Sequence, residues 1–313
     1  MEVFSQYFSM LNRLLSLLTA LMFGFYLSNT YASRAVRPWQ TTKTASLGGA
    51  GIASPTMIEG LYLNPAMFSF FTNSSFYFQD TLAKLEPKSA DRTDTFGNDR
   101  NPDGFTAAIT DGSNHSKGGF SYTDQEESAT KRKRYGFGFA GMIDGNSSVG
   151  INYSYIQQSY QEGSREIKES LHIGSIGYLN ILSPQFSIGF TWNDPFWADR
   201  INSKTIFGIQ YHPVESIALL LDAGQDPKRS INKTFNYSAG VEYEFYQDVF
   251  ARFGVFQDKL FNLRGYGFGL GWIGARIGFE VAMKQSSRKD NFDTYLLEYE
   301  KLKETELSLL YLF

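Results

Sequence analysis

The chain ends with the stretch Glu306-Leu307-Ser308-Leu309-Leu310-Tyr311-Leu312-Phe313, in which Leu307, Leu309, Tyr311 and Phe313 stand at every second position. Side chains of a β-strand alternate between the two faces of a sheet, so this stretch predicts a strand with one apolar face. If that face meets lipid, the sheet must close on itself, because a bilayer has no water to satisfy the backbone groups of an open edge. Soluble strands also end on aromatic residues, so the fold class depends on the rest of the chain.

The same alternation recurs along most of the chain. The clearest strands are predicted at 135–139, 149–155, 186–192, 207–211, 235–245, 249–255, 266–272 and 275–283. Weaker alternation is found near 75–81, 104–110, 118–123, 171–179 and 217–221. Together with the C-terminal stretch, these segments predict about fourteen strands.

The connections between these segments alternate in length. Long, charged connections are expected at 84–103, 123–134, 158–168, 193–204, 223–233, 257–264 and 284–294, and short ones at 111–115, 144–147, 180–184, 212–215, 246–248 and 273–274. Outer-membrane barrels have longer outer loops and short periplasmic turns. The sequence therefore predicts an all-β fold, a transmembrane antiparallel β-barrel of about 14 strands at residues 73–313.

The composition agrees with a barrel although the mean hydropathy of −0.28 is typical of a soluble protein. In a barrel, lipid-facing residues are averaged with polar residues that face the lumen, so the mean is low. The chain contains 28 Phe, 19 Tyr and 29 Gly. Aromatic residues suit the two membrane interfaces, and glycine relieves crowding inside. The net charge of −3 indicates no particular partner.

The N-terminus has the pattern of a secretory signal. Arg13 precedes a mostly apolar run at 14–27, and small residues suitable for cleavage follow near Ala32. We expect residues 1–32 to be a signal peptide, since the run is shorter than the roughly 20 apolar residues of a membrane anchor, the alternative. The absence of cysteine excludes a disulfide and a lipoprotein anchor. Export without either suits the bacterial outer membrane.

Residues 33–72 show little alternation and precede the first predicted strand. They contain a glycine-alanine stretch with Leu47, Gly48, Gly49 and Gly51, and then Asn64-Pro65-Ala66. A barrel of about fourteen strands has a lumen wider than side chains alone fill. We therefore predict that this segment folds into the lumen as a plug.

These two motifs, placed just before the first strand, resemble the long-chain fatty acid transporter (FadL-like) superfamily. That superfamily includes transporters of fatty acids and aromatic hydrocarbons, and also PorV-like barrels of secretion systems. The resemblance implies that Leu47, Gly48, Gly49, Gly51, Asn64, Pro65 and Ala66 belong to a hatch that closes the periplasmic end. It covers the architecture of the mature chain but only about twenty residues of motif, and this chain is shorter than typical transporters. The ending Leu307, Leu309, Tyr311 and Phe313 likewise resembles the signal read by the barrel-assembly machinery.

Strand parity places several residues on the lumen side. Inward glycines are predicted at 136, 138, 265, 267, 269 and 271, where missing side chains make room for a ligand or for the hatch itself. Arg252, Phe256, Arg276 and Glu280 also face inward and form a tentative ligand site. An arginine there is able to bind a carboxylate headgroup, whereas a salt bridge that holds the plug is the alternative.

Other chemistries lack support in the sequence. The three histidines, His115, His172 and His212, have no visible catalytic partner, with His172 expected in the lumen, so no enzyme is expected. No cluster has metal-ligand spacing, and no cofactor is implied. The basic run 131–134 is expected in an outer loop and not on nucleic acid. Lys301 and Lys303 face outward, where they either meet lipopolysaccharide phosphates or extend into solvent.

Two functions remain open. The first is uptake of a hydrophobic small molecule through a lumen site and the hatch. The second is a scaffold or secretion-system barrel that does not transport. Short outer loops favour the scaffold, whereas the inward glycines and apolar inward residues such as Leu220 favour transport.

Overall fold

The computed structural model describes residues 38–55, 59–86, 103–112, 117–127, 130–162, 164–199, 203–288 and 301–313. The predicted signal peptide and most of the first long connection lie outside these residues. No helix within the described ranges is long and apolar enough to cross a membrane.

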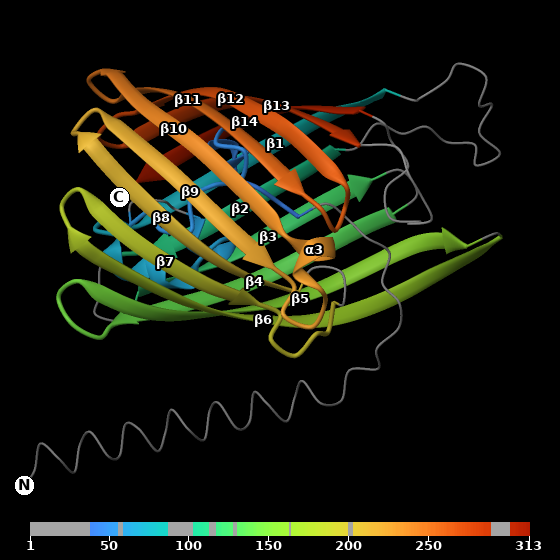
Figure 1. Cartoon of the computed structure of the whole chain (residues 1–313). Helices are drawn as coiled ribbons and strands as arrows, with labels where there is room; N and C mark the ends of the chain where they lie inside the picture. Colours follow the sequence, from blue (N-terminus) through green and yellow to red (C-terminus); the bar gives the residue numbers. More distant parts are fainter. Residues whose placement is uncertain are drawn as a thin grey trace, which may run out of the picture.

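In the described residues, fourteen antiparallel strands form one closed barrel, as the sequence predicts (Figure 1). The strands are β1 (Ser75–Glu86), β2 (Asp103–Asp111), β3 (Lys117–Glu127), β4 (Thr130–Met142), β5 (Ser147–Glu162), β6 (Arg165–Ser183), β7 (Phe186–Asn193), β8 (Lys204–Val214), β9 (Ile217–Gln225), β10 (Asn236–Tyr246), β11 (Val249–Asp258), β12 (Leu263–Ile273), β13 (Ile277–Arg288) and β14 (Lys301–Leu312). Each strand pairs with its sequence neighbours, and β1 pairs with β14 to close the barrel. Phe76 and Phe313 stack at this closure, with ring centroids 5.1 Å apart.

The barrel has two different ends. Short connections join β2 to β3, β4 to β5, β6 to β7, β8 to β9, β10 to β11 and β12 to β13 at one end, which we call the turn end. The other end, the loop end, carries the connection between β7 and β8 and the one that contains α3 (Ile231–Thr234). Phe313 lies at the turn end.

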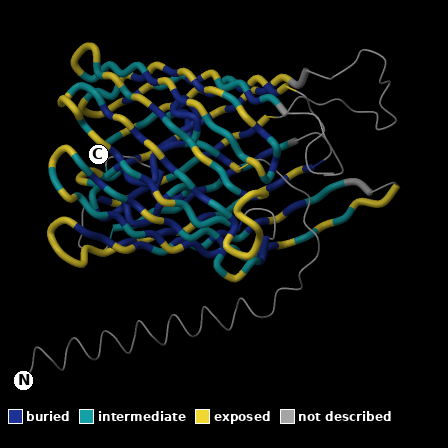
Figure 2. Tube along the Cα trace, in the orientation of Figure 1, coloured by how far each residue is buried: buried dark blue, intermediate teal, exposed yellow. Residues whose placement is uncertain are grey.

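The two faces of the wall differ as strand alternation requires. Large apolar residues such as Phe253, Phe268 and Leu307 are exposed on the outside. Polar residues such as Gln79, Thr106 and Asn152 are buried on the inside (Figure 2). The amphipathic wall thus has the orientation of a membrane barrel, apolar outside and polar inside.

Two predicted loops are wrong, because the strands continue through them. β3 and β4 pair as far as Glu127 and Thr130, and β5 and β6 as far as Glu162 and Arg165. The outward residues of these extensions are polar and form cross-strand pairs, for example Lys131 with Glu126 at 3.2 Å. Since both faces are polar there, the sequence loses the apolar alternation that marks a strand.

A short N-terminal stretch lies inside the barrel, drawn in blue in Figure 1. It contains α2 (Thr42–Ser46), η1 (Glu59–Leu61) and η2 (Pro65–Phe70). We call residues 38–55 and 59–72 the lumen segment. The helix α2 contacts β11 to β14, whereas η2 contacts β3 to β6, so the segment reaches opposite sides of the wall.

Candidate functional site

Asn64 joins the two halves of the lumen segment to the wall. Its Nδ2 donates to the carbonyl of Ile52 at 2.9 Å and to that of Tyr178 on β6 at 3.0 Å. Its Oδ1 accepts from the N–H of Ala66 at 3.1 Å and caps η2. A Cβ on Gly177 would lie 1.9 Å from this oxygen, so the wall leaves no room for a side chain there. The Asn64 side chain is therefore fixed by contacts on three sides.

The turn after α2 presses its backbone against the other side of the barrel. Gly48 and Gly49 have φ of +66° and +92°, in the left-handed region that favours glycine. A Cβ on Gly254 of β11 would lie 2.0 Å from the carbonyl carbon of Leu47. Leu47 is fully buried, so this part of the lumen is closed by direct contact between wall and backbone.

Asp222 of β9 holds the end of the same turn. The N–H groups of Gly51 and Ile52 donate to its Oδ2 at 2.7 and 3.1 Å. On β7, two strands away, the Ser187 hydroxyl donates to the carbonyl of Ala53 at 2.6 Å. Wall side chains thus satisfy backbone groups of a segment that has little regular structure of its own.

Several inward glycines of the wall lie against the lumen segment, whereas Gly265 and Gly271 lie against other residues of the wall. A Cβ on Gly138 would meet the Phe68 ring at 2.6 Å, and one on Gly267 would meet the carbonyl oxygen of Ala45 at 2.0 Å. The space that the sequence left open for a ligand or a hatch is filled by chain in these places.

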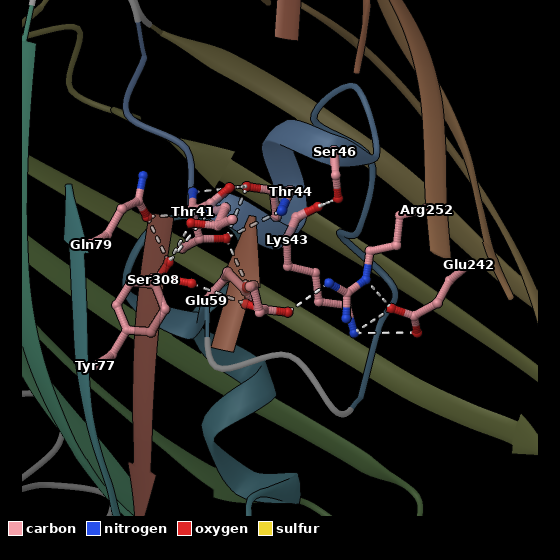
Figure 3. A network of polar contacts seen from close by, with 12 residues as sticks. Thr41, Lys43, Thr44, Ser46, Glu59, Tyr77, Gln79, Glu242, Arg252 and Ser308 are labelled. Carbon is pink, nitrogen blue, oxygen red and sulfur yellow. Dashed lines mark hydrogen bonds and ion pairs between the residues drawn. The ribbon is translucent and has the colours of Figure 1, made fainter. Parts of the chain in front are cut away.

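Arg252 lies between two glutamates of the wall. Its Nε donates to Glu242 at 2.5 Å, and its Nη1 donates to Glu280 at 2.6 Å. Lys43 of α2 approaches Glu242 at 3.1 Å (Figure 3). Arg252 is only 2 % exposed. At Arg252 and Glu280 the structure shows the salt bridge that the sequence left open as the alternative to a ligand site, because both charges belong to a cluster that ties α2 to the wall.

A hydrogen-bond network continues from this cluster to β1. The Thr41 hydroxyl donates to Glu59 at 2.7 Å, and the N–H of Thr42 lies within hydrogen-bond distance of Tyr77 Oη and Gln79 Oε1, at 3.2 and 3.1 Å (Figure 3). All five residues are buried. The α2 side of the lumen segment is thus held by side-chain polar contacts.

Two further predicted positions differ in the structure. Arg276 is exposed in the turn between β12 and β13, outside the lumen, because β13 begins at Ile277, two residues later than predicted. His172 is not in the lumen, since it pairs with the outward-facing Tyr155 and its Nδ1 lies 2.6 Å from the Tyr153 hydroxyl. Neither residue contributes to a lumen site.

A cavity of about 230 Å³ lies between the lumen segment and the loop end. Its apolar lining comes from Trp39, Tyr62, Leu63, Ile156, Ile173, Ile206, Phe256, Phe261 and Leu263. Its charged lining comes from Arg132, Arg134, Asp199, Lys204, Asp258, Lys284 and Glu304. Of the four residues predicted to bind ligand, only Phe256 lines this cavity. Arg132 and Arg134 also line the cavity but were not predicted to do so. They stand at inward positions of a part of β4 for which the sequence predicts a loop.

Most cations of the cavity are paired. Lys204 bonds to Asp258 at 2.5 Å, and Lys284 lies 3.7 Å from Glu304 and 4.9 Å from the centre of the Phe256 ring. Arg134 differs, since the contacts of its guanidinium among the described residues are the Ser154 hydroxyl at 3.0 Å and the Tyr62 ring at 5.7 Å. Within the described part of the chain, the Arg134 guanidinium thus has no carboxylate at ion-pair distance, although Asp199 lies near enough to act on it electrostatically.

The connection between β7 and β8 folds over the cavity. Asp194 accepts from the N–H groups of Ala198 and Asp199 at 2.9 and 2.7 Å. Asp199 is buried and lies 3.9 Å from Arg132. Burial raises the pKa of Asp194 to about 6. This connection therefore contains a carboxyl group that titrates below neutral pH.

The architecture is that of a closed fourteen-strand barrel with an occupied lumen. The structure of the CymD monoaromatic hydrocarbon channel is similar, with a TM-score of 0.70 and 12 % identity over 87 % of this chain and 97 % of that one. The Ralstonia pickettii toluene transporter TbuX has a TM-score of 0.67 and 11 % identity, over 88 % of this chain and 99 % of the transporter. A Pseudomonas aeruginosa FadL homologue has a TM-score of 0.61 and 11 % identity, over 89 % of this chain and 99 % of the homologue. No family model and no curated protein sequence matches the chain.

These similarities show the fold of the chain. It has the fold of a FadL homologue and of hydrocarbon channels, as the strand number indicated. At 10–12 % identity, nothing further about this chain follows from the similarity itself.

Proposed function

We propose that the chain is a bacterial outer-membrane barrel that takes up hydrophobic small molecules, and that the lumen segment is its hatch. The observation that carries this proposal is a partly apolar cavity at the loop end, closed below by a segment that fills the turn end. The barrels of similar fold include a monoaromatic hydrocarbon channel and a toluene transporter. In this orientation the loop end faces outward and the turn end faces the periplasm.

The cavity suits a small apolar molecule that carries at most one polar group. Its aromatic and aliphatic walls supply burial, and Arg134 supplies a donor at one edge. A volume of about 230 Å³ accommodates a monoaromatic ring or part of an acyl chain. Long-chain fatty acid and toluene are therefore the probes to compare.

Passage requires the hatch to move, because its backbone contacts the wall at Gly150, Gly177 and Gly254. Asn64 is central to this step, since its side chain bonds to both the hatch and β6. We place the chain in the outer membrane after cleavage near Ala32. Its outward surroundings are lipid and, at Lys301 and Lys303, lipopolysaccharide, and its Phe313 ending is read by the barrel-assembly machinery.

The test is uptake of radiolabelled long-chain fatty acid and of radiolabelled toluene by cells that lack their own transporters. Three proteins are compared at equal surface amount: the intact chain, Asn64→Ala, and Gly141→Ala, whose added Cβ meets nothing within 4 Å. We expect saturable uptake of at least one probe by the intact chain and by Gly141→Ala, with a loss of saturation in Asn64→Ala. Uptake of neither probe above empty cells would overturn the proposal and favour a scaffold barrel.

A further inference from the structure

One carboxylate faces outward from the apolar wall. On β1 the outward residues are Phe76, Phe78, Asp80, Leu82 and Lys84, and all five are exposed. Leu82, on the loop side of Asp80, is 59 % exposed, and Phe78, on the turn side, is 42 % exposed. On its own strand, Asp80 therefore lies within the apolar band.

On the neighbouring strands, the row of Asp80 holds the last apolar outward residue before the loop end, since Asp103 on β2 and Thr305 on β14 stand opposite Leu82. Asp80 pairs with Phe105 on β2 and with Leu307 on β14. Both of these neighbours are outward-facing and exposed, at 42 % and 53 %. Within the described part of the chain, no group hydrogen-bonds or ion-pairs with the Asp80 carboxylate. A carboxylate that faces hydrocarbon without a partner is unfavourable, and charged positions of this kind mark functional sites in membrane proteins.

Of the other outward charges of the described strands, Asp103 stands opposite Leu82 and interacts electrostatically with Asp80, Asp111 lies at the turn end, and Asp124 stands opposite Phe105. Lys84 and Lys303, which carry the same charge, stand opposite each other on β1 and β14. Asp124 is 3.8 Å from Lys133, and Glu126 is 3.2 Å from Lys131. Those residues have water or an opposite charge nearby. Asp80 is the outward charge that has exposed apolar side chains on both sides of it along its own strand.

Asp80 also lines a groove of about 570 Å³ on the outer surface. The groove extends from β10 across β11 to β14 and β1 as far as β2, and it includes Phe78, Leu270, Trp272, Phe279, Leu307 and Leu309. The outside of a barrel is convex, so a groove there requires bulky rims and an exposed strand backbone between them. Its lining is almost entirely apolar except at the Asp80 end.

We infer that this groove docks a second membrane-spanning protein, which places a lysine or arginine side chain against Asp80. We choose a cationic partner because of charge complementarity: a cation or a strong hydrogen-bond donor is needed to compensate the carboxylate at this depth. A folded spanning element holds such a group inside the hydrocarbon region. A free amphiphilic cation would instead have to leave the interface, where its charged head is solvated.

A second copy of the chain does not fit this requirement. Two copies related by an axis along the membrane normal present the same depths to each other. At the depth of Asp80, the groove offers Phe105, Leu307 and Val281, all apolar. The nearest outward cations, Lys84 and Lys303, stand four residues nearer the loop end on their strands. A symmetric dimer would leave both carboxylates unpaired.

The experiment uses photo-crosslinking in the cells that naturally make the protein. A photoreactive amino acid replaces Leu307 in the groove or, as a control, Phe207 on the far side of the barrel. Each is combined with Asp80 or with Asp80→Asn, at matched surface amount. We expect one protein product from position 307, reduced about thirtyfold or more by Asp80→Asn, as when one member of a desolvated charge pair is removed.

The crosslinked peptide must contain a lysine or arginine, and exchanging the charges, Asp80→Lys with that cation changed to aspartate, must restore the product. A second readout separates docking from a structural role: in pure lipid vesicles, Asp80→Asn should raise the thermal midpoint of the barrel. No product at 307, a product unaffected by Asp80→Asn, a product between two copies of the chain, or a lowered midpoint would each overturn the inference.

Discussion

The lumen segment is held differently on its two sides. On the η2 side, wall and segment meet through backbone and neutral groups: Gly150 faces the backbone of Pro65 and Ala66, and Asn64 bonds to Tyr178. On the α2 side, backbone contacts at Gly254 and Gly267 are joined by an ion cluster of Lys43, Glu242, Arg252 and Glu280. Both sides thus have backbone contacts, but the α2 side also depends on ion pairs, which respond to salt, protonation and competing charges. We therefore expect the α2 side to release first when the hatch moves.

The largest expected effect comes from adding a methyl group to the wall on each side of the lumen segment. Gly150→Ala would place a Cβ 2.3 Å from the carbonyl carbon of Pro65, and Gly254→Ala would place one 2.0 Å from that of Leu47. Both neighbours are backbone, so the segment must shift, and we expect a loss of about 3 kcal/mol, the upper range for overpacking. Urea unfolding in lipid vesicles and single-channel conductance in planar bilayers measure the stability and the opening.

The control is Gly141→Ala, which meets nothing within 4 Å. It should retain both stability and low conductance. If Gly150→Ala and Gly254→Ala also behave like the intact chain, the lumen segment is not packed against the wall as described.

Removing one charge tests the ionic side. Arg252→Leu leaves Glu242 with Lys43 alone and leaves Glu280 without its cation. Breaking a buried pair in this way costs about 3 kcal/mol where water is excluded and less in a wet lumen. We expect a conductance that rises in Arg252→Leu at low salt, because α2 loses its tie to the wall.

The intact chain should in turn show more openings at 1 M than at 0.1 M salt, since salt weakens ion pairs that water reaches. Arg252→Lys keeps the charge and should preserve most of the closure. Conductance independent of salt in the intact chain would contradict the idea that the α2 side releases first.

The neutral side should respond less to a single side chain. Asn64→Ala removes the cap of η2 and leaves the carbonyls of Ile52 and Tyr178 without their donor. The expected loss is about 2 kcal/mol, the sum of a cap and partly compensated carbonyls. Hydrogen exchange of the N–H groups of 64–70 measures it. In Asn64→Asp the cap acceptor remains but the donor is lost, so an intermediate loss is expected, and equal protection in all three proteins would show that Asn64 is not a joint.

The sequence predicts the features that follow from the alternation of apolar and polar residues. It does not predict the strand extensions in which this alternation is lost. Strand number and the inward glycines follow from parity, which the apolar outer face makes visible. The extended parts of β3 to β6 carry polar residues on both faces, so Arg132 and Arg134 were read as loop residues. The prediction for Arg276 is wrong because a boundary shift of two residues moves its side chain from the lumen to a turn. The pairing of Arg252 with Glu280 required the register of three strands, which no local pattern contains.

The smallest expected effect is a pH dependence that we expect in the connection between β7 and β8 at the loop end but not in residues 64–70 of the hatch. Asp194 has a folded-state pKa of about 6, above the ordinary 3.8, because it is buried. The folded connection therefore binds the proton more tightly than the unfolded one, so its stability is greatest below about pH 4, falls as the pH rises to about 6, and then levels off. Proteolysis of the connection between β7 and β8 should be slower at pH 4 than at pH 7, and Asp194→Asn should remove the difference. Hydrogen exchange of 64–70 should not follow this profile, because that half of the lumen segment is held by neutral contacts. A parallel change in both regions would mean that the covering connection and the hatch move together, and the two ends of the lumen would then act as one gate.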